Sequence, residues 1–372
     1  MKIGCPKEIK NHEYRVGLTP NAVLAYVQDG HEVYIEKGAG LGSAISDEEY
    51  VSAGAKILPS AEEVWNIAEM LVKVKEPLES EYKLMKENQL VYTYFHFAAN
   101  EPLLKACLER KIISLAYETV QEGHALPLLK PMSEVAGRMS ALMGAFYSAR
   151  TQGGRGLLPM GVTGVAPADV LILGGGIVGT NAAFSAAGLG ARVTVLDINL
   201  NRLEYLGEIL PPNMKGIYND PLTLNQYLKT ADIIIGAVLI PGAKTPKLVK
   251  KEQLKIMKPG AVLVDVAIDQ GGCFETSIPT THSDPTFVME NILHYCVANM
   301  PGAYARTSTF ALNNATLSYG LQLAELGAEK ACRASGAIKL GLNTYKGVIT
   351  YKPVAEAFGM ESKYTKPEDV IR

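Results

Sequence analysis

Short hydrophobic segments alternate with amphipathic segments along the first third of the chain. The hydrophobic segments have the length of β-strands and lie at residues 1–5, 31–36, 70–75, 90–95 and 112–117. Between them, apolar residues recur at helical spacing over residues 20–29, 46–53, 61–68 and 101–110. Thr19 followed by Pro20 is a typical helix start, because a capping hydroxyl precedes a residue with a helical φ. This alternation predicts a parallel sheet covered by helices.

A second alternating series starts near residue 168. It follows a long predicted helix, which runs from Ser133 as its capping residue to about residue 152, and a glycine-rich break at 153–156. Strands are predicted at 169–173, 192–196, 233–237, 262–266 and 292–297, and the tail is predicted to be helical around 315–335. We therefore expect an α/β protein with two Rossmann-like, doubly wound parallel-sheet domains and a cleft between them. A discontinuous substrate (catalytic) domain, residues 1–130 and 307–372, would surround a nucleotide-binding domain of residues 131–306.

The composition fits a protein with a well-filled interior and no polyanionic partner. Of 372 residues, 48% are hydrophobic and 20% are charged, and the formal net charge is −2. A chain of this length usually forms two domains. No basic run suggests nucleic-acid binding, and no apolar run reaches the ~20 residues that a membrane helix needs. The five cysteines are scattered and never spaced as CxxC, which argues against a zinc site or a disulfide framework. With no signal peptide in the first residues, we expect a cytoplasmic protein without a metal.

The clearest chemical motif is a glycine turn between a strand and a helix. Gly174, Gly176 and Gly179 fit the pattern GxGxxG after the strand at 169–173, and an alanine-rich helix follows. The first glycine permits the tight turn, the second lets a pyrophosphate approach the backbone, and the third lets helix and strand pack closely. Asp197 ends the next strand, where a carboxylate can accept hydrogen bonds from ribose hydroxyls and repel a 2′-phosphate. The motif therefore predicts NAD as the cofactor, and a solvated strand-end carboxylate is the alternative explanation of Asp197.

Three positive or protonatable side chains follow predicted strands of the first domain. Arg15 lies in the loop after the first strand, and Lys75 and His96 lie at the ends of later strands. Because ligands of open α/β sheets bind at the carboxyl ends of the strands, we expect the three to converge on a small carboxylate with an adjacent carbonyl. Two of the positions also have ordinary explanations. Lys73 and Lys75 share one face of their strand and suit a solvated sheet edge, and His96 suits a satisfied structural histidine.

Polar side chains also follow the predicted strands of the second domain. Asp269 lies just after the strand at 262–266, at the edge where a nicotinamide ring should lie. Asp265, inside that strand, is better explained by structural hydrogen bonds. Arg202, a few residues beyond Asp197, suits either a contact to adenine or a solvated helix surface.

Segments distributed over nearly the whole chain resemble the alanine dehydrogenase family. Its relatives include saccharopine dehydrogenase and the NAD-binding alpha subunit of proton-translocating transhydrogenase, and that subunit shares VDVAIDQGG and HEYRVGLTP in part. The matching segments include PKEIKNHEYRVGLTP, LVKVKEP, LPLLKPMSEVAGR, LGGGIVG, MKPGAVLVDVAIDQGGCFE and CVANMPGA. The resemblance implies NAD-dependent oxidative deamination of L-alanine to pyruvate and ammonium, the reverse reductive amination, and a cytosolic homohexamer. The chain departs from the family at Asn219, where a small hydroxyl is frequent, and at Tyr304 and Ala305, where Val-Pro is common.

The resemblance also implies roles for individual residues. Arg15 and Lys75 would hold the carboxylate and keto oxygen of pyruvate, His96 would be the acid/base group, and Asp269 would assist at the reacting carbon. The implied cofactor-binding residues are Ser133, Gly174, Gly176, Gly179, Asp197, Arg202, Val238, Leu239, Ala267, Ile268, Asp269, Asn299 and Met300. The alternatives are a transhydrogenase subunit, which passes hydride to a partner subunit, and a non-catalytic NAD-sensing protein. Neither alternative needs a substrate site built from Arg15, Lys75 and His96.

Overall fold

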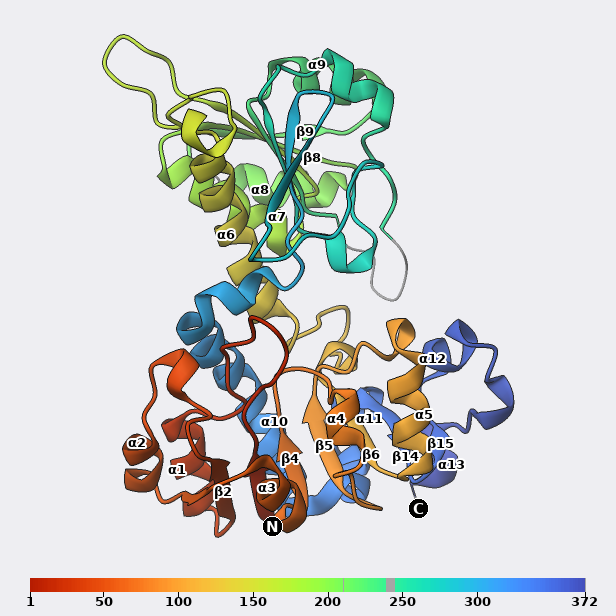
Figure 1. Ribbon diagram of the computed structural model, residues 1–372. Helices are drawn as coiled ribbons and strands as arrows, with labels where there is room; N and C mark the ends of the chain where they lie inside the picture. The colour runs from red at the N-terminus through yellow and green to blue at the C-terminus, as the bar shows by residue number, and fades with distance from the viewer. Residues whose placement is uncertain (210, 239–244, 372) are drawn as a thin grey trace. The chain divides into compact units, whose positions relative to one another are not determined.

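The chain forms two compact units. The computed structural model describes residues 1–209, 211–238 and 245–371. Unit 1 consists of Met1–Met132 together with Tyr304–Arg372, and unit 2 consists of Ser133–Ala303 (Figure 1). Each unit is built on its own sheet, so each can be described by itself.

The sheet of unit 1 has the strand order β15-β14-β6-β5-β4-β1-β2-β3. The first six strands in the chain are β1 (Lys2–Cys5), β2 (Glu32–Glu36), β3 (Lys56–Leu58), β4 (Met70–Val72), β5 (Leu90–Thr93) and β6 (Ile113–Ala116), and they are mutually parallel. From the tail come β14 (Leu342–Tyr345), antiparallel to β6, and β15 (Val348–Ile349), antiparallel to β14. The chain order of the parallel strands reverses between β1 and β4, which makes this pair the switch point of a doubly wound sheet.

Helices cover both faces of this sheet. They are α1 (Pro20–Gln28), α2 (Asp47–Ser52), α3 (Ala61–Ile67), α4 (Glu79–Tyr82), α5 (Glu101–Glu109), α10 (Ala305–Ala334), α11 (Gly336–Gly341), α12 (Lys352–Ala357) and α13 (Pro367–Val370), with 3-10 turns η1 (Leu41–Ser43), η2 (Phe97–Ala99), η3 (Tyr117–Thr119) and η8 (Glu361–Lys363). Val91 of β5 packs in one hydrophobic cluster with residues of α3 and α5. The next residue, Tyr92, points to the opposite face, where its hydroxyl donates to the Thr316 carbonyl of α10 at 3.2 Å.

The sheet of unit 2 has the order β12-β13-β11-β10-β7-β8-β9. Its parallel strands are β7 (Asp169–Leu173), β8 (Arg192–Asp197), β9 (Met214–Tyr218), β10 (Ile233–Gly236), β11 (Val262–Asp265) and β13 (Ile292–Tyr295), and the edge strand β12 (Thr286–Met289) is antiparallel to β13. The helices and turns are α6 (Lys130–Tyr147), η4 (Arg150–Gln152), α7 (Ile177–Gly188), α8 (Leu200–Ile209), α9 (Pro221–Thr230), η5 (Lys251–Ile256), η6 (Ile268–Gln270) and η7 (Met300–Tyr304). The order reverses between β7 and β10, so this sheet has the same switch-point topology.

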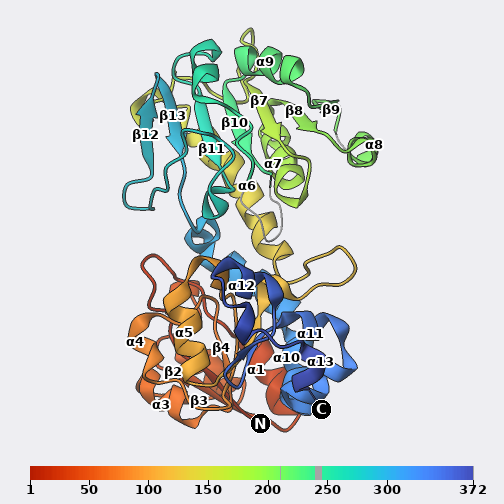
Figure 2. The ribbon, with the colours of Figure 1, turned by 90° about the vertical axis from the view of Figure 1, so that its right-hand side faces the viewer.

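Alternate residues of the central strands of unit 2 are buried on opposite faces. Val170 and Ile172 of β7 pack in the cluster that contains α6 and α7, whereas Leu171 and Leu173 pack with α9 and η5. Figure 2 shows α6 and α7 beside this sheet. A sheet buried on both faces explains why these strands are continuous apolar runs in the sequence.

The predicted fold class, two doubly wound sheets in which parallel strands dominate, is confirmed, and several element boundaries were wrong. The long helix α6 begins at Lys130, so Ser133 lies in its first turns and is not its cap. The strand predicted over 70–75 ends at Val72. The tail, predicted to be helical, also supplies β14 and β15. Among the described residues, no helix combines the length and the apolar run that crossing a bilayer requires.

Candidate active site

Three of the predicted site residues lie at one edge of the unit 1 sheet. Arg15 is in the loop after β1, Lys75 follows β4, and His96 follows β5. These strands are neighbours in the order β5-β4-β1 and run parallel, so their carboxyl ends lie at the same edge. The β1–β4 switch point is where ligands of doubly wound sheets usually bind.

Arg15 is a buried cation held by a carboxylate. Its Nε and Nη2 atoms donate to the two carboxylate oxygens of Glu13 at 2.6 and 2.5 Å, and Nη1 donates to the Met132 sulfur at 2.9 Å. Arg15 is 2% exposed. Burial acts against the charge of its guanidinium, but the charge and hydrogen bonds of Glu13, together with Tyr94 and Glu8, outweigh burial and raise the pKa of Arg15. The forked pairing fixes the plane of the guanidinium. Sequence reasoning missed Glu13, which lies only two residues away.

Lys73 and Lys75 are not a solvated edge. Their strand lies between β1 and β5, and the two side chains belong to residues that are 0% and 9% exposed. Lys73 Nζ lies 3.3 Å from a Glu8 carboxylate oxygen and 3.0 Å from one of Glu81. The backbone N–H of Lys75 donates to Glu8 at 3.2 Å, and its carbonyl accepts the Thr93 hydroxyl at 3.0 Å. The solvated-edge explanation was therefore wrong.

His96 lies on the surface in a backbone conformation that few non-glycine residues adopt. Its φ is +49°, in the left-handed region, which costs a non-glycine residue about 1–3 kcal/mol and often marks a functional site. One Glu118 oxygen accepts its backbone N–H at 2.6 Å, and the same carboxylate accepts that of Phe95 at 3.2 Å. Because His96 is exposed, it is not a buried structural histidine.

Tyr94 connects the surroundings of Arg15 and His96. The His96 ring stacks on the Tyr94 ring, with centroids 5.7 Å apart and planes inclined by 8°. The Tyr94 hydroxyl donates to the Leu128 carbonyl at 2.5 Å. Burial raises the pKa of that hydroxyl, and the positive charge of Arg15 partly opposes the rise. Tyr94 thus stacks on His96 through its ring, while the charge of Arg15 acts on its hydroxyl. Tyr94 was not singled out from the sequence, where it stands in an apolar strand pattern.

Gly174, Gly176 and Gly179 of the turn in unit 2 each have the local geometry that the GxGxxG motif predicts for them. Gly174 has φ +98°, and a Cβ there would lie 2.8 Å from Val238. At Gly179 a Cβ would lie 1.8 Å from the Gly174 carbonyl oxygen, so helix α7 and the turn touch directly. At Gly176 a Cβ would meet nothing within 4 Å. This open backbone precedes the first turn of the 12-residue helix α7, whose free N–H groups suit an anion.

Asp197 and Arg202 both bind the glycine turn. Asp197, at the end of β8, accepts the Gly175 N–H at 2.6 Å and the Asn199 N–H at 2.8 Å. Arg202 donates through Nε to the Gly175 carbonyl and through Nη2 to the Thr180 hydroxyl at 2.6 Å. Neither residue is a simple solvated side chain. Their contacts order the turn that precedes α7.

The other predicted cofactor residues follow the carboxyl ends of β10, β11 and β13, with one exception. Val238 follows β10, Ala267, Ile268 and Asp269 surround the turn η6, and Asn299 and Met300 follow β13; Ser133 is instead half-buried on α6. Leu239 lies outside the described residues. Asp265 has the structural role that we expected. It accepts the backbone N–H groups of Ala267 at 3.1 Å and Cys273 at 2.9 Å, together with the Ser277 hydroxyl.

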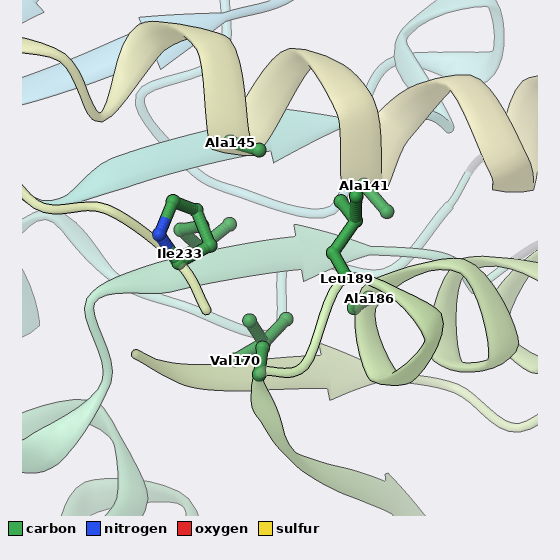
Figure 3. Close-up of a pocket in the computed structure, with 8 residues that line it drawn as sticks. Ala141, Ala145, Val170, Ala186, Leu189 and Ile233 are labelled. Atoms are coloured by element: carbon green, nitrogen blue, oxygen red, sulfur yellow. The ribbon is translucent and has the colours of Figure 1, made fainter. Parts of the chain in front are cut away.

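Two hollows elsewhere in unit 2 do not coincide with these residues. Figure 3 shows side chains of α6, α7, β7 and β10 around a gap of about 10 Å³, which has room for roughly one water molecule. Its lining is apolar, so it is a packing gap of the core. A hollow of about 460 Å³ lies at the amino ends of β7, β8 and β9, lined by Asp169, Arg192 and Lys215 among others. That is the opposite edge of the sheet from the glycine turn.

Comparison with known proteins identifies the family. Residues 4–136 match the domain described as "Alanine dehydrogenase/PNT, N-terminal domain", and residues 140–352 match "Alanine dehydrogenase/PNT, C-terminal domain". The chain is 54% identical to proteins named alanine dehydrogenase from Methanococcus maripaludis and Staphylococcus haemolyticus, over 100% of this chain and of each relative.

Solved structures agree with this assignment. A structure named L-alanine dehydrogenase is 47% identical, with a TM-score of 0.94 over 96% of this chain and 99% of that one. A transhydrogenase structure from Sinorhizobium meliloti is 24% identical, with a TM-score of 0.82 over 94% of this chain and 100% of that one, and shows the shared fold alone. The chain belongs to the alanine dehydrogenase/PNT family.

Proposed function

We propose that this protein catalyses the NAD-dependent interconversion of L-alanine with pyruvate and ammonium. The prediction of an amino-acid dehydrogenase is confirmed by relatives named alanine dehydrogenase that match over their full length. The observation that carries the substrate site is the common edge of β1, β4 and β5. These three neighbouring strands are followed by two cations, Arg15 and Lys75, and by one protonatable ring, that of His96.

The three side chains have complementary tasks in the proposed reaction. Arg15 binds the substrate carboxylate, in a plane that Glu13 fixes. Lys75 stabilises negative charge that develops on the substrate oxygen. His96 takes up or donates the proton of that oxygen. Holding the reacting carbon in one orientation is the main contribution that the protein makes to such a step.

The second unit has the features that NAD needs. The open backbone at Gly176 and the N-terminus of α7 suit the pyrophosphate, and Asp197 suits the ribose hydroxyls and disfavours a 2′-phosphate. When bound, NAD supplies the acceptor for the hydride that leaves the alanine Cα. We propose the remaining cofactor contacts for Ser133, Gly174, Gly179, Arg202, Val238, Leu239, Ala267, Ile268, Asn299 and Met300. Asp269, on the η6 turn, would orient the water that attacks the imino carbon.

The finer assignments rest on the family resemblance. We propose residues 1–130 and 307–372 as the substrate domain and residues 131–306 as the NAD-binding domain. The same resemblance supports a cytoplasmic homohexamer. Sedimentation of the purified protein measures the oligomer directly, and a mass of one or two chains would contradict the hexamer.

A spectrophotometric assay tests the function. Purified protein, pyruvate, ammonium and NADH should give a loss of absorbance at 340 nm that requires all four components. Glyoxylate, 2-oxobutyrate, and lysine with 2-oxoglutarate form the comparison panel. Oxidation of NADH only with the lysine pair would indicate a saccharopine dehydrogenase. Binding of NADH without turnover on any substrate would indicate a binding protein or a subunit that needs a partner.

A further inference from the structure

A buried charge network lies under the segment that carries Lys75. Lys73, the residue after β4, is 0% exposed, and its ammonium bridges two carboxylates at 3.3 Å (Glu8) and 3.0 Å (Glu81). Glu8 comes from the loop after β1, and Glu81 comes from α4. The two carboxyl side chains are only 2% and 4% exposed. Three ionisable groups from separate segments are thus removed from water at the switch point of the sheet.

Both carboxylates also bind the backbone on either side of Lys75. Glu8 Oε1 accepts the N–H groups of Val74 at 2.6 Å and Lys75 at 3.2 Å, while its other oxygen pairs with Lys73. Glu81 Oε2 accepts the N–H of Leu78 at 2.9 Å, while its other oxygen pairs with Lys73. The segment from 74 to 78 is therefore held at both ends by carboxylates that share one ammonium.

The same kind of contact recurs at the neighbouring strand. Glu118, from the turn after β6, accepts the consecutive N–H groups of Phe95 and His96. In both places a carboxylate from an adjacent loop binds two successive N–H groups just beyond a strand. Both pairs include a residue proposed to act on the substrate, which suggests that the contacts serve presentation of those side chains.

Stability alone does not explain why three ionisable groups are buried here. Three buried ions lose hydration, and such groups seldom stabilise a fold more than apolar side chains of the same volume. Burial raises the pKa of Glu8, and the charge of Lys73 opposes that rise. With Lys73 present, Glu8 can stay an anion and accept two N–H groups. Without it, Glu8 and Glu81 would be two buried like charges, which separate or take up protons.

We propose that Lys73, Glu8 and Glu81 form a clamp that positions Lys75 for the substrate oxygen. They act through the backbone of residues 74–78, so all three are positioning residues. This inference rests on the proposed function, in which Lys75 contacts the keto acid. A clamp of this kind affects binding of the keto acid more than binding of the nucleotide, because it lies within unit 1.

The test compares Lys73→Met with Lys73→Arg and with a matched control in unit 2. Lys258, whose side chain is 30% exposed, also pairs with a buried carboxylate, Asp232, at 2.8 Å, and Arg155 lies 3.3 Å from the same carboxylate. Lys258→Met therefore removes one lysine–carboxylate pair away from the clamp and leaves Asp232 with a second cation. The measurements are KM for pyruvate, KM for NADH, melting temperature, and hydrogen exchange of the amides of residues 74 and 75. Displacing a substrate-binding group by about 1 Å can cost roughly 100-fold.

Lys73→Met should raise KM for pyruvate roughly 10- to 100-fold, leave KM for NADH within about twofold, and speed exchange at residues 74 and 75. Lys73→Arg should restore most of the pyruvate affinity, and Lys258→Met should lower only the melting temperature. A Lys73→Met enzyme with a lower melting temperature and an unchanged KM for pyruvate overturns the proposal.

Three further outcomes also test the proposal. If Lys73→Met does not fold, Glu81→Gln keeps the ammonium and its bond to Glu8; an unchanged KM for pyruvate in that variant overturns the clamp. If the unaltered enzyme turns over a different oxo acid, the proposed substrate is wrong, and the same variants test the clamp with that acid. If no oxo acid is turned over, the proposed function fails, and unchanged amide exchange at residues 74 and 75 in Lys73→Met overturns the clamp independently.

Discussion

Two alanine substitutions in one glycine turn should have opposite consequences for stability and nucleotide affinity. At Gly179 a Cβ would lie 1.8 Å from the Gly174 carbonyl oxygen, whereas ordinary Cβ contacts begin at 3.4 Å. Helix α7 and the turn would have to separate by about 1.6 Å, the difference between these distances. Forced overpacking of this kind costs about 3 kcal/mol or more. For a domain of the size of unit 2, Ser133–Ala303, we expect a melting temperature lower by roughly 6–12 °C.

Gly176→Ala should behave differently, because a Cβ there meets nothing within 4 Å and φ is −65°. The melting temperature should stay the same or rise slightly, because alanine restricts the unfolded chain. The added methyl group would occupy the surface on which the pyrophosphate is proposed to lie. We expect the dissociation constant of NADH to rise about tenfold or more, which corresponds to about 1.4 kcal/mol.

Nucleotide fluorescence titration and calorimetry separate these effects. Gly188→Ala is the control, since it makes the same change at the other end of α7, where a Cβ also meets nothing within 4 Å. It should leave NADH affinity unchanged, and its melting temperature should stay the same or rise slightly, because alanine also restricts the unfolded chain there. Unaltered NADH affinity in a folded Gly176→Ala enzyme would refute the placement of the pyrophosphate. An unaltered melting temperature in Gly179→Ala would refute the close packing of α7 on the turn.

Three other variants test separate parts of the reasoning. His96→Ala should lower turnover roughly 10²- to 10⁴-fold; near-normal kcat would remove His96 from the chemistry. Asp197→Ala should lower the ratio of kcat/KM for NADH to that for NADPH, and an unchanged ratio would contradict its role. His294 is fully buried, and burial lowers its pKa below the ordinary value of 6.5. The unfolded chain therefore binds a proton that the folded chain does not, so the free energy of unfolding should fall as pH drops below about 6.5. In His294→Phe, urea midpoints at pH 7.5 and 5.5 should differ less than in the unaltered protein, and an equal difference would rule out this contribution.

Periodicity was sufficient to predict the doubly wound sheets. Strands such as Asp169–Leu173 are buried on both faces, so they appear in the sequence as apolar runs, and the intervening helices have clear starts. The turn glycines and Asp197 could also be predicted from the sequence, because the motif that contains them is local. Short edge strands carry no such signal. Leu342–Tyr345 and Val348–Ile349 have four and two residues, and their pairing with β6 depends on tertiary context.

The partners of the site residues could not be found from the sequence. The alternation in Met70 to Lys75 suggested a longer strand, but Glu8, distant in the chain, takes the N–H groups of Val74 and Lys75. Lys73 consequently pairs with carboxylates and not with water. Ser133 resembled a helix cap, yet α6 starts at Lys130, where Pro131 suits the first turn. For Lys73 and Lys75 the decisive contacts join residues that no local pattern connects, whereas Pro131 is a local signal for the true start of α6.

The discontinuous construction of unit 1 has a consequence for synthesis on the ribosome. Strand β6 pairs with β5 on one side and with β14 on the other, and β14 is translated only after the whole of residues 133–303. Until then the outer N–H and C=O groups of β6 lack a strand partner, and an open edge of this kind can recruit other chains. A nascent chain that stops before residue 342 leaves this edge open, whereas unit 2 is contiguous and can complete its own sheet earlier.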